Sequence, residues 1–140
     1  MRRDPPACWR EARAPDTAAI EALAREAAAG LPAPFAAIAA TLVIRVEEFA
    51  DEATLDELGI ENALELTGLY EGRALTERAH DDPPALPDTV RLFRRAILDE
   101  WADRGDVALG DLVTHVLVHE IAHHLGWSDD DIAAIDPWWT

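Results

Sequence analysis

The fold of this chain is decided by one apolar stretch, Asp111-Leu-Val-Thr-His-Val-Leu-Val-His-Glu-Ile-Ala-His-His-Leu-Gly126. Its apolar residues and its ends predict a helix that starts near Asp111 and ends at Gly126. His119, Glu120 and His123 lie within it in the pattern H-E-x-x-H. Residues four apart are about 40° apart around a helix axis, so the two imidazoles project from one face.

This spacing is typical of a zinc site. Two neutral imidazoles can take two positions of a tetrahedral zinc ion, and a third protein ligand leaves the fourth position for water. Glu120 is rotated by about 100° from His119, close enough to reach a metal-bound water without coordinating the metal. The alternative is a pair of core histidines satisfied by hydrogen bonds. Burying two imidazoles and a carboxylate is unfavourable by several kcal/mol unless something such as a metal compensates.

The third ligand is expected just after the helix. Gly126 can turn the chain back by adopting positive φ, and Asp129 then completes the pattern H-E-x-x-H-x-x-G-x-x-D. A carboxylate oxygen is a competent zinc ligand, so we predict Asp129 as the third ligand and Asp130 as the next choice. The alternative is structural, because Ser128–Asp131 also fits the N-cap and acidic first turn of a short last helix near 130–135.

Four other polar side chains are weaker candidates for the site. His115 lies one turn before the first motif histidine, and we assign it to packing, to support of the ligands or to contact with a substrate. His124 points about 100° away from the second ligand. Tyr70 and Arg78 are candidates for stabilising a developing oxyanion, and Tyr70 for facing the substrate, although isolated residues of these types are more often structural.

Composition restricts the class of protein. The formal net charge is −16, and all 12 basic residues are Arg. Such an acidic field repels phosphate backbones and anionic lipid, so we expect neither a nucleic acid nor a membrane as partner. Cys8 is the only cysteine, which excludes a disulfide framework and cysteine-based zinc fingers. No stretch has the length of a signal peptide core or a membrane span, so a cytoplasmic protein is expected. We also expect a monomer.

A chain of 140 residues fits one domain. We predict a disordered, proline-rich arm over 1–15, followed by a single domain over 16–140. Before the motif helix we predict a helix over 17–29 capped by Asp16, and then a helical turn after Pro34. Strands are predicted over 42–49, 66–72 and 89–93. A short helix opened by a Thr54 capping box and closed by Gly59 follows the first strand, and a helix over 94–103 that stops at Gly105 follows the last. This order predicts an α+β fold with about three strands in a small mixed sheet packed on helices.

Three segments resemble the minimal zincins of bacteria, short proteins of the zincin-like metallopeptidase family. The resemblance covers roughly residues 35–135, and its last segment is the most specific. The segments are Gly68-Leu-Tyr-Glu-Gly72 with Leu75-Thr-Glu-Arg78, Leu86-Pro-Asp-Thr-Val-Arg-Leu-Phe-Arg94, and His115–Gly126 with Asp129. The resemblance implies a minimal zincin-like fold with one zinc held by His119, His123 and Asp129. It also implies a general base at Glu120.

The predicted function is hydrolysis of a peptide or protein substrate. Zinc lowers the pKa of its bound water toward ~7, and Glu120 takes the proton and passes it to the leaving amine. An edge strand around 66–70 would align the extended substrate over the metal. The alternative is a zinc-binding structural or interaction module without turnover, including an adaptor with a vestigial site. Met1 is the only methionine, so the methionine turn of the larger metzincins cannot form here.

Overall fold

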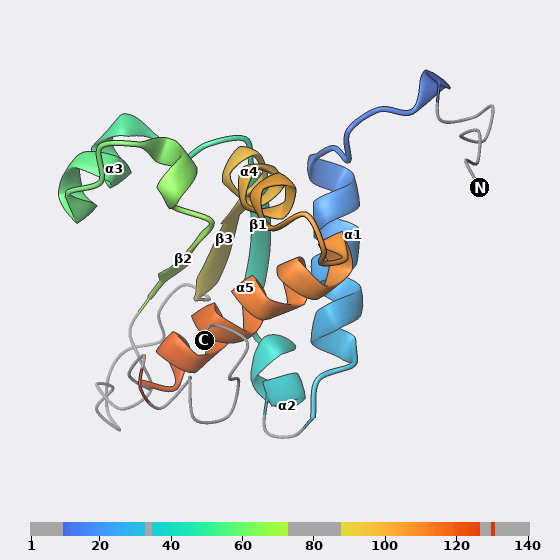
Figure 1. Cartoon of the computed structure of the whole chain (residues 1–140). Coiled ribbons are helices and arrows are strands. Elements are labelled where there is room, and N and C mark those ends of the chain that lie inside the picture. The colour runs from blue at the N-terminus through green and yellow to red at the C-terminus, as the bar shows by residue number, and fades with distance from the viewer. Residues whose placement is uncertain (1–9, 33–34, 73–87, 127–129, 131–140) are drawn as a thin grey trace, which may run out of the picture.

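The computed structural model describes residues 10–32, 35–72, 88–126 and 130. Its helices surround a small sheet (Figure 1). In chain order the elements are α1 (Thr17–Ala29), α2 (Phe35–Ala39), β1 (Val43–Glu47), α3 (Glu52–Leu58), the 3₁₀ helix η2 (Ala63–Glu65), β2 (Gly68–Glu71), β3 (Thr89–Phe93), α4 (Arg94–Arg104) and α5 (Leu109–His124). Within the described ranges, no helix has the length and apolar character needed to cross a membrane.

The sheet is 3-stranded, has the order β1-β3-β2 and mixes both strand directions. β1 runs parallel to β3, with Ile44 opposite Val90, whereas β2 runs antiparallel to β3, with Gly68 opposite Leu92. This architecture confirms the predicted α+β class with a small mixed sheet on helices. Within the described part of the chain, β2 lies at one edge of the sheet, as expected for the strand predicted near residues 66–70.

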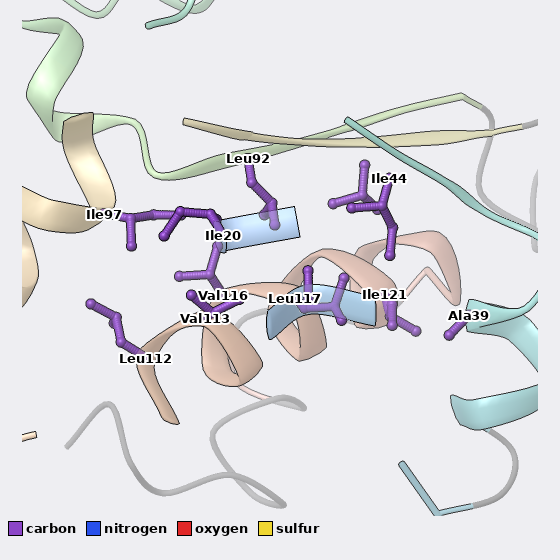
Figure 2. Close-up of a cluster of buried hydrophobic side chains, with 12 residues drawn as sticks. Ile20, Ala39, Ile44, Leu92, Ile97, Leu112, Val113, Val116, Leu117 and Ile121 are labelled. Carbon is purple, nitrogen blue, oxygen red and sulfur yellow. The ribbon is translucent and has the colours of Figure 1, made fainter. Parts of the chain in front are cut away.

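The main core lies between the sheet and two helices, α1 and α5 (Figure 2). Its buried members include Ile20 and Ala24 from α1, Ile44, Val90 and Leu92 from the sheet, and Leu112, Val113, Val116, Leu117 and Ile121 from α5. Side chains alternate across a strand, so Val90 and Leu92 reach the same face of β3. Burial of the apolar face of α5 against this sheet fixes the rotation of the helix, and therefore the direction of its polar side chains.

The opposite face of the sheet carries Arg91 at its centre. Its Nη2 donates to Glu47 Oε1 of β1 at 2.8 Å, and its Nη1 donates to Glu71 Oε1 of β2. The hydrogen bonds to Glu47 and then to Glu71 raise the pKa of Arg91 above its ordinary value, against the effect of burial. Because the Arg91 side chain is only 14% exposed, solvent screens these ion pairs less than surface pairs. Arg91 thus ties the central strand to both neighbours.

Local signals in the sequence predicted most helix ends. The Asp16 carboxylate caps α1 as predicted, and Gly105 adopts positive φ after α4. The predicted start of α3 is wrong, because Asp51 rather than Thr54 is the N-cap. The Asp51 carboxylate accepts hydrogen bonds from the Thr54 hydroxyl and backbone N–H, which lower the pKa of Asp51. Aspartate is a stronger cap than threonine, so the helix begins one turn earlier.

Candidate metal centre

Helix α5 brings the two motif histidines together. The Nε2 atoms of His119 and His123 are 2.9 Å apart, and their ring centroids are 4.6 Å apart. Two nitrogens bound to one tetrahedral zinc, each about 2.0–2.1 Å from it, are separated by about 3.3–3.4 Å. The two Nε2 atoms therefore lie within hydrogen-bond distance of each other, and about half an ångström closer than two nitrogens bound to one zinc. This pair of nitrogen donors fits a zinc ion.

The direction of the imidazoles follows from burial of the rest of the helix. Leu117 lies two residues before His119 and Ile121 two residues after it. Each is therefore about 160° from His119 around the helix axis. Both are 0% exposed. Nδ1 of His119 is buried as well, so Nε2 is the nitrogen that faces His123. The core therefore holds the helix with its histidine pair directed away from the main cluster.

Glu120 lies beside the edge strand β2. A Cβ added to Gly68 would lie 3.3 Å from Glu120 Cγ and 2.9 Å from Val116 Cγ1. The missing side chain at Gly68 thus lets the strand approach α5 more closely than another residue would permit. The carboxylate, the two imidazoles and the edge strand are neighbours in space, although the strand and the helix are far apart in the sequence.

Tyr70 joins β2 to the start of β3. Its hydroxyl donates to Asp88 Oδ2 at 2.9 Å, and Asp88 is only 8% exposed. The Asp88 carbonyl in turn accepts the backbone N–H of Val43 at 2.9 Å. Gly72 lies against the same carboxylate, since a Cβ there would come 2.2 Å from Oδ1. Asp88 therefore connects all the strands of the sheet, and the contact predicted between Tyr70 and a substrate stays a prediction.

Sequence reasoning did not single out Asp88. A buried aspartate just before a strand has no pattern of its own. The glycines at 68 and 72 carried the only signal, because glycine inside a strand pattern marks a close approach of another group. His115, which was singled out, is 4% exposed. Its role in packing, in support of the ligands or in substrate contact stays a prediction.

The third ligand is not tested by the structure. Asp129 and Arg78 lie outside the described residues, and Asp130 is described and exposed. Within those described ranges, no group of three or more His, Cys, Asp or Glu side chains is placed to hold a metal. Gly126 has a φ of 79°, which is the turn that we predicted after the motif helix. The structure therefore brings together two of the expected ligands and turns the chain where the third is expected.

Comparison with known proteins identifies the family. The family model for zincin-like metallopeptidases matches residues 39–139, which include the sheet and the motif helix. The chain therefore belongs to the zincin-like metallopeptidase family. A search of curated proteins found no significant match. Membership of this family implies zinc binding and peptide hydrolysis in general terms, and it agrees with the donor pair on α5.

The close approach of β2 to α5 can be tested at Gly68. Gly68→Ala is expected to lower the free energy of unfolding by about 1–3 kcal/mol through overpacking. The reason is that the nearest atom, at 2.9 Å, belongs to the β-branched Val116, which cannot rotate without strain. Chemical denaturation measures the loss.

Gly30→Ala is the matched control for this test. Gly30 has a φ of −93° and its nearest neighbour would be 3.6 Å from a new Cβ. Its change in unfolding free energy should stay within about 0.5 kcal/mol. Equal effects of the two substitutions would contradict the close packing at Gly68.

The Tyr70–Asp88 hydrogen bond can be tested by a double-mutant cycle. Tyr70→Phe and Asp88→Ala should each destabilise the fold, and the double variant should lose less than their sum. We expect a coupling energy of about 1–3 kcal/mol, because the acceptor is a largely buried carboxylate. Urea unfolding of all variants gives this value, and strict additivity would rule out the bond.

Proposed function

We propose that this chain is a zinc-dependent peptidase that holds one zinc ion through His119, His123 and Asp129. The observation that carries the proposal is the convergence of the two imidazole Nε2 atoms, 2.9 Å apart, on α5. Bound zinc supplies a Lewis acid that polarises the scissile carbonyl and lowers the pKa of water. Imidazole nitrogens with one carboxylate oxygen form a donor set suited to this metal.

In this proposal Glu120 performs the proton transfers. Its side chain follows His119 on the helix and lies against Gly68 of β2, so it is held next to the donor pair. The carboxylate accepts a proton from the attacking water as the C–O bond forms, and donates it to the leaving amine as the peptide C–N bond breaks. A purely structural zinc needs no base beside its ligands, and this favours hydrolysis over a structural module.

Strand β2 is proposed to align the substrate. Among the described residues it pairs only with β3, so its other edge carries backbone N–H and C=O groups that can pair with an extended peptide. Because Gly68 lies against Glu120, a peptide paired with this edge would pass the general base. A domain of this size has little material for deep specificity pockets, so we expect a shallow groove and weak or narrow specificity.

The role of Glu120 is tested by Glu120→Gln. This variant should keep one zinc per chain, measured by elemental mass spectrometry, because the substituted side chain is not a ligand. Its rate of hydrolysis of a peptide library should fall by about 10²–10⁴-fold, because the general base is lost. Glu26→Gln makes the same chemical change at an exposed position on α1 and should leave both readouts unchanged.

Three results would contradict parts of the proposal. Wild-type protein purified without chelator that lacks stoichiometric zinc would remove the metal centre. Zinc without cleavage across a broad peptide library would favour the structural module. Full activity of Glu120→Gln would show that another group is the base.

The third ligand is tested by a pair of neighbouring substitutions. Asp129→Ala should weaken zinc binding by more than about 100-fold, because the loss of a ligand exceeds the loss of a residue that only supports a ligand. Loss of such a supporting residue weakens binding by about 10–100-fold. Asp130→Ala should leave zinc affinity unchanged, because this side chain is exposed. Competition with a chromogenic chelator measures both affinities. The reverse order of effects would assign the ligand to Asp130.

A further inference from the structure

A second surface, formed by α3, the turn that follows it and η2, has no part in the proposed metal centre. It contains a groove of about 570 Å³ lined by Glu52, Leu55, Asp56, Gly59, Ile60, Glu61 and Ala63. We call this the α3–η2 groove. Its volume falls within the range of about 300–1,000 Å³ that is usual for small-molecule pockets, which is room for a few side chains of a bound segment. The lining combines apolar side chains with carboxylates.

Residues 49–64, which include the lining of this groove, carry exposed apolar side chains. Helix α3 has no fully buried residue. Among the described residues, the large apolar side chains that are strongly exposed are Phe49 (47%), Leu58 (45%), Leu64 (36%) and Val43 (40%), and all but Val43 belong to this part of the chain. Leu58 and Leu64 directly adjoin lining residues in the sequence. Exposed apolar side chains gathered in one segment indicate an interface rather than random scatter.

The charge of the same segment has one sign. Between Val46 and Gly72 the sequence contains no Arg, Lys or His, whereas Glu and Asp recur throughout. The cation that reaches α3 from the sheet is Arg91, whose Nη1 lies 3.5 Å from Thr54 Oγ1. That guanidinium is already paired with Glu47 and Glu71. Of the groove's own carboxylates, Glu52, Asp56 and Glu61 are all exposed, and their field favours a cationic occupant.

We propose that the α3–η2 groove docks a cationic, amphipathic segment of another protein. Apolar side chains of that segment would contact Leu55, Ile60 and, at the apolar rim, Leu58, while its Lys or Arg side chains would pair with the carboxylates of the groove. This docking does not depend on the proposed peptidase activity. If that activity also holds, docking would bring a substrate next to β2, which follows η2 directly; this last consequence alone rests on the proposed function.

The test uses the full chain carrying Glu120→Gln, so that binding is measured without cleavage. The probe is a fluorescent peptide of about 12 residues, roughly three helical turns, with Leu and Lys spaced to form one apolar and one cationic face. Two control peptides replace Leu by Ser or Lys by Glu. Fluorescence anisotropy should show binding of the Leu–Lys peptide alone, weakened by added salt because charges contribute. Equal binding of the Ser–Lys peptide, or no binding of the Leu–Lys peptide, would overturn the proposal.

Charge reversal locates the binding site. Asp56→Lys combined with Glu61→Lys should weaken binding of the Leu–Lys peptide by at least about tenfold, because rim attraction becomes repulsion. Glu26→Lys combined with Asp103→Lys makes the same change in net charge at exposed positions on α1 and α4 and should have little effect. Equal weakening by the two pairs would show attraction by net charge only, and would overturn the proposal.

The apolar part of the proposal is tested by Leu58→Ser. Because Leu58 is 45% exposed, the fold should tolerate this change, and circular dichroism checks that it does. Binding of the Leu–Lys peptide should weaken severalfold. Unchanged affinity in the folded variant would show that the apolar rim takes no part, and would overturn docking of an amphipathic segment.

Discussion

The candidate site depends on one close approach, that of Gly68 in β2 to helix α5. Val116 and Glu120 are one turn apart on the helix, and both lie against the place where a Gly68 side chain would stand. The helical period directs other residues elsewhere: Leu117 and Ile121 enter the core, while the two histidines converge on each other. Different faces of this one helix therefore pack into the core, contact the edge strand and carry the metal-binding pair.

An edge strand as short as β2 needs external support, because glycine at its start contributes no side-chain packing. Two tethers provide that support. On the outer face, Glu71 pairs with Arg91 of the central strand, and at the end of the strand Tyr70 donates to Asp88. Both tethers join β2 to β3 or to the residue just before it, so they fix the distance of the strand from α5 as well as its register. This is how a small domain can hold a base and an edge strand in a defined relation without a large core.

The sequence predicted what local chemistry determines. Asp16, Gly105 and Gly126 end or begin helices where their cap and turn preferences place them, and the period of the motif stretch fixed which residues of α5 are buried. The predicted N-cap of α3 was wrong because two capping residues three positions apart compete, and Asp51 prevails over Thr54. Strand order could not be predicted, since the central position of β3 arises from pairing between distant segments. For the same reason only the glycine at 72 hinted at the partnership of Asp88 with Tyr70 and Gly72, whereas the spacing of His119 and His123 follows from one helix.

The acidity of the chain acts locally rather than as one field over the molecule. At physiological ionic strength, interactions between exposed charges fade over about 8 Å, so the carboxylates of the α3–η2 groove influence their own surroundings most strongly. Any coupling between the groove and β2 beyond that range must pass through packed residues. Arg91 contacts both β2 and α3, since it pairs with Glu71 of β2 and reaches Thr54 of α3. Because its side chain is mostly buried, these contacts are less exposed to screening than the groove itself. Arg91 of the central strand thus contacts both elements, and this connection does not require that the charges of the groove and of β2 act on each other directly.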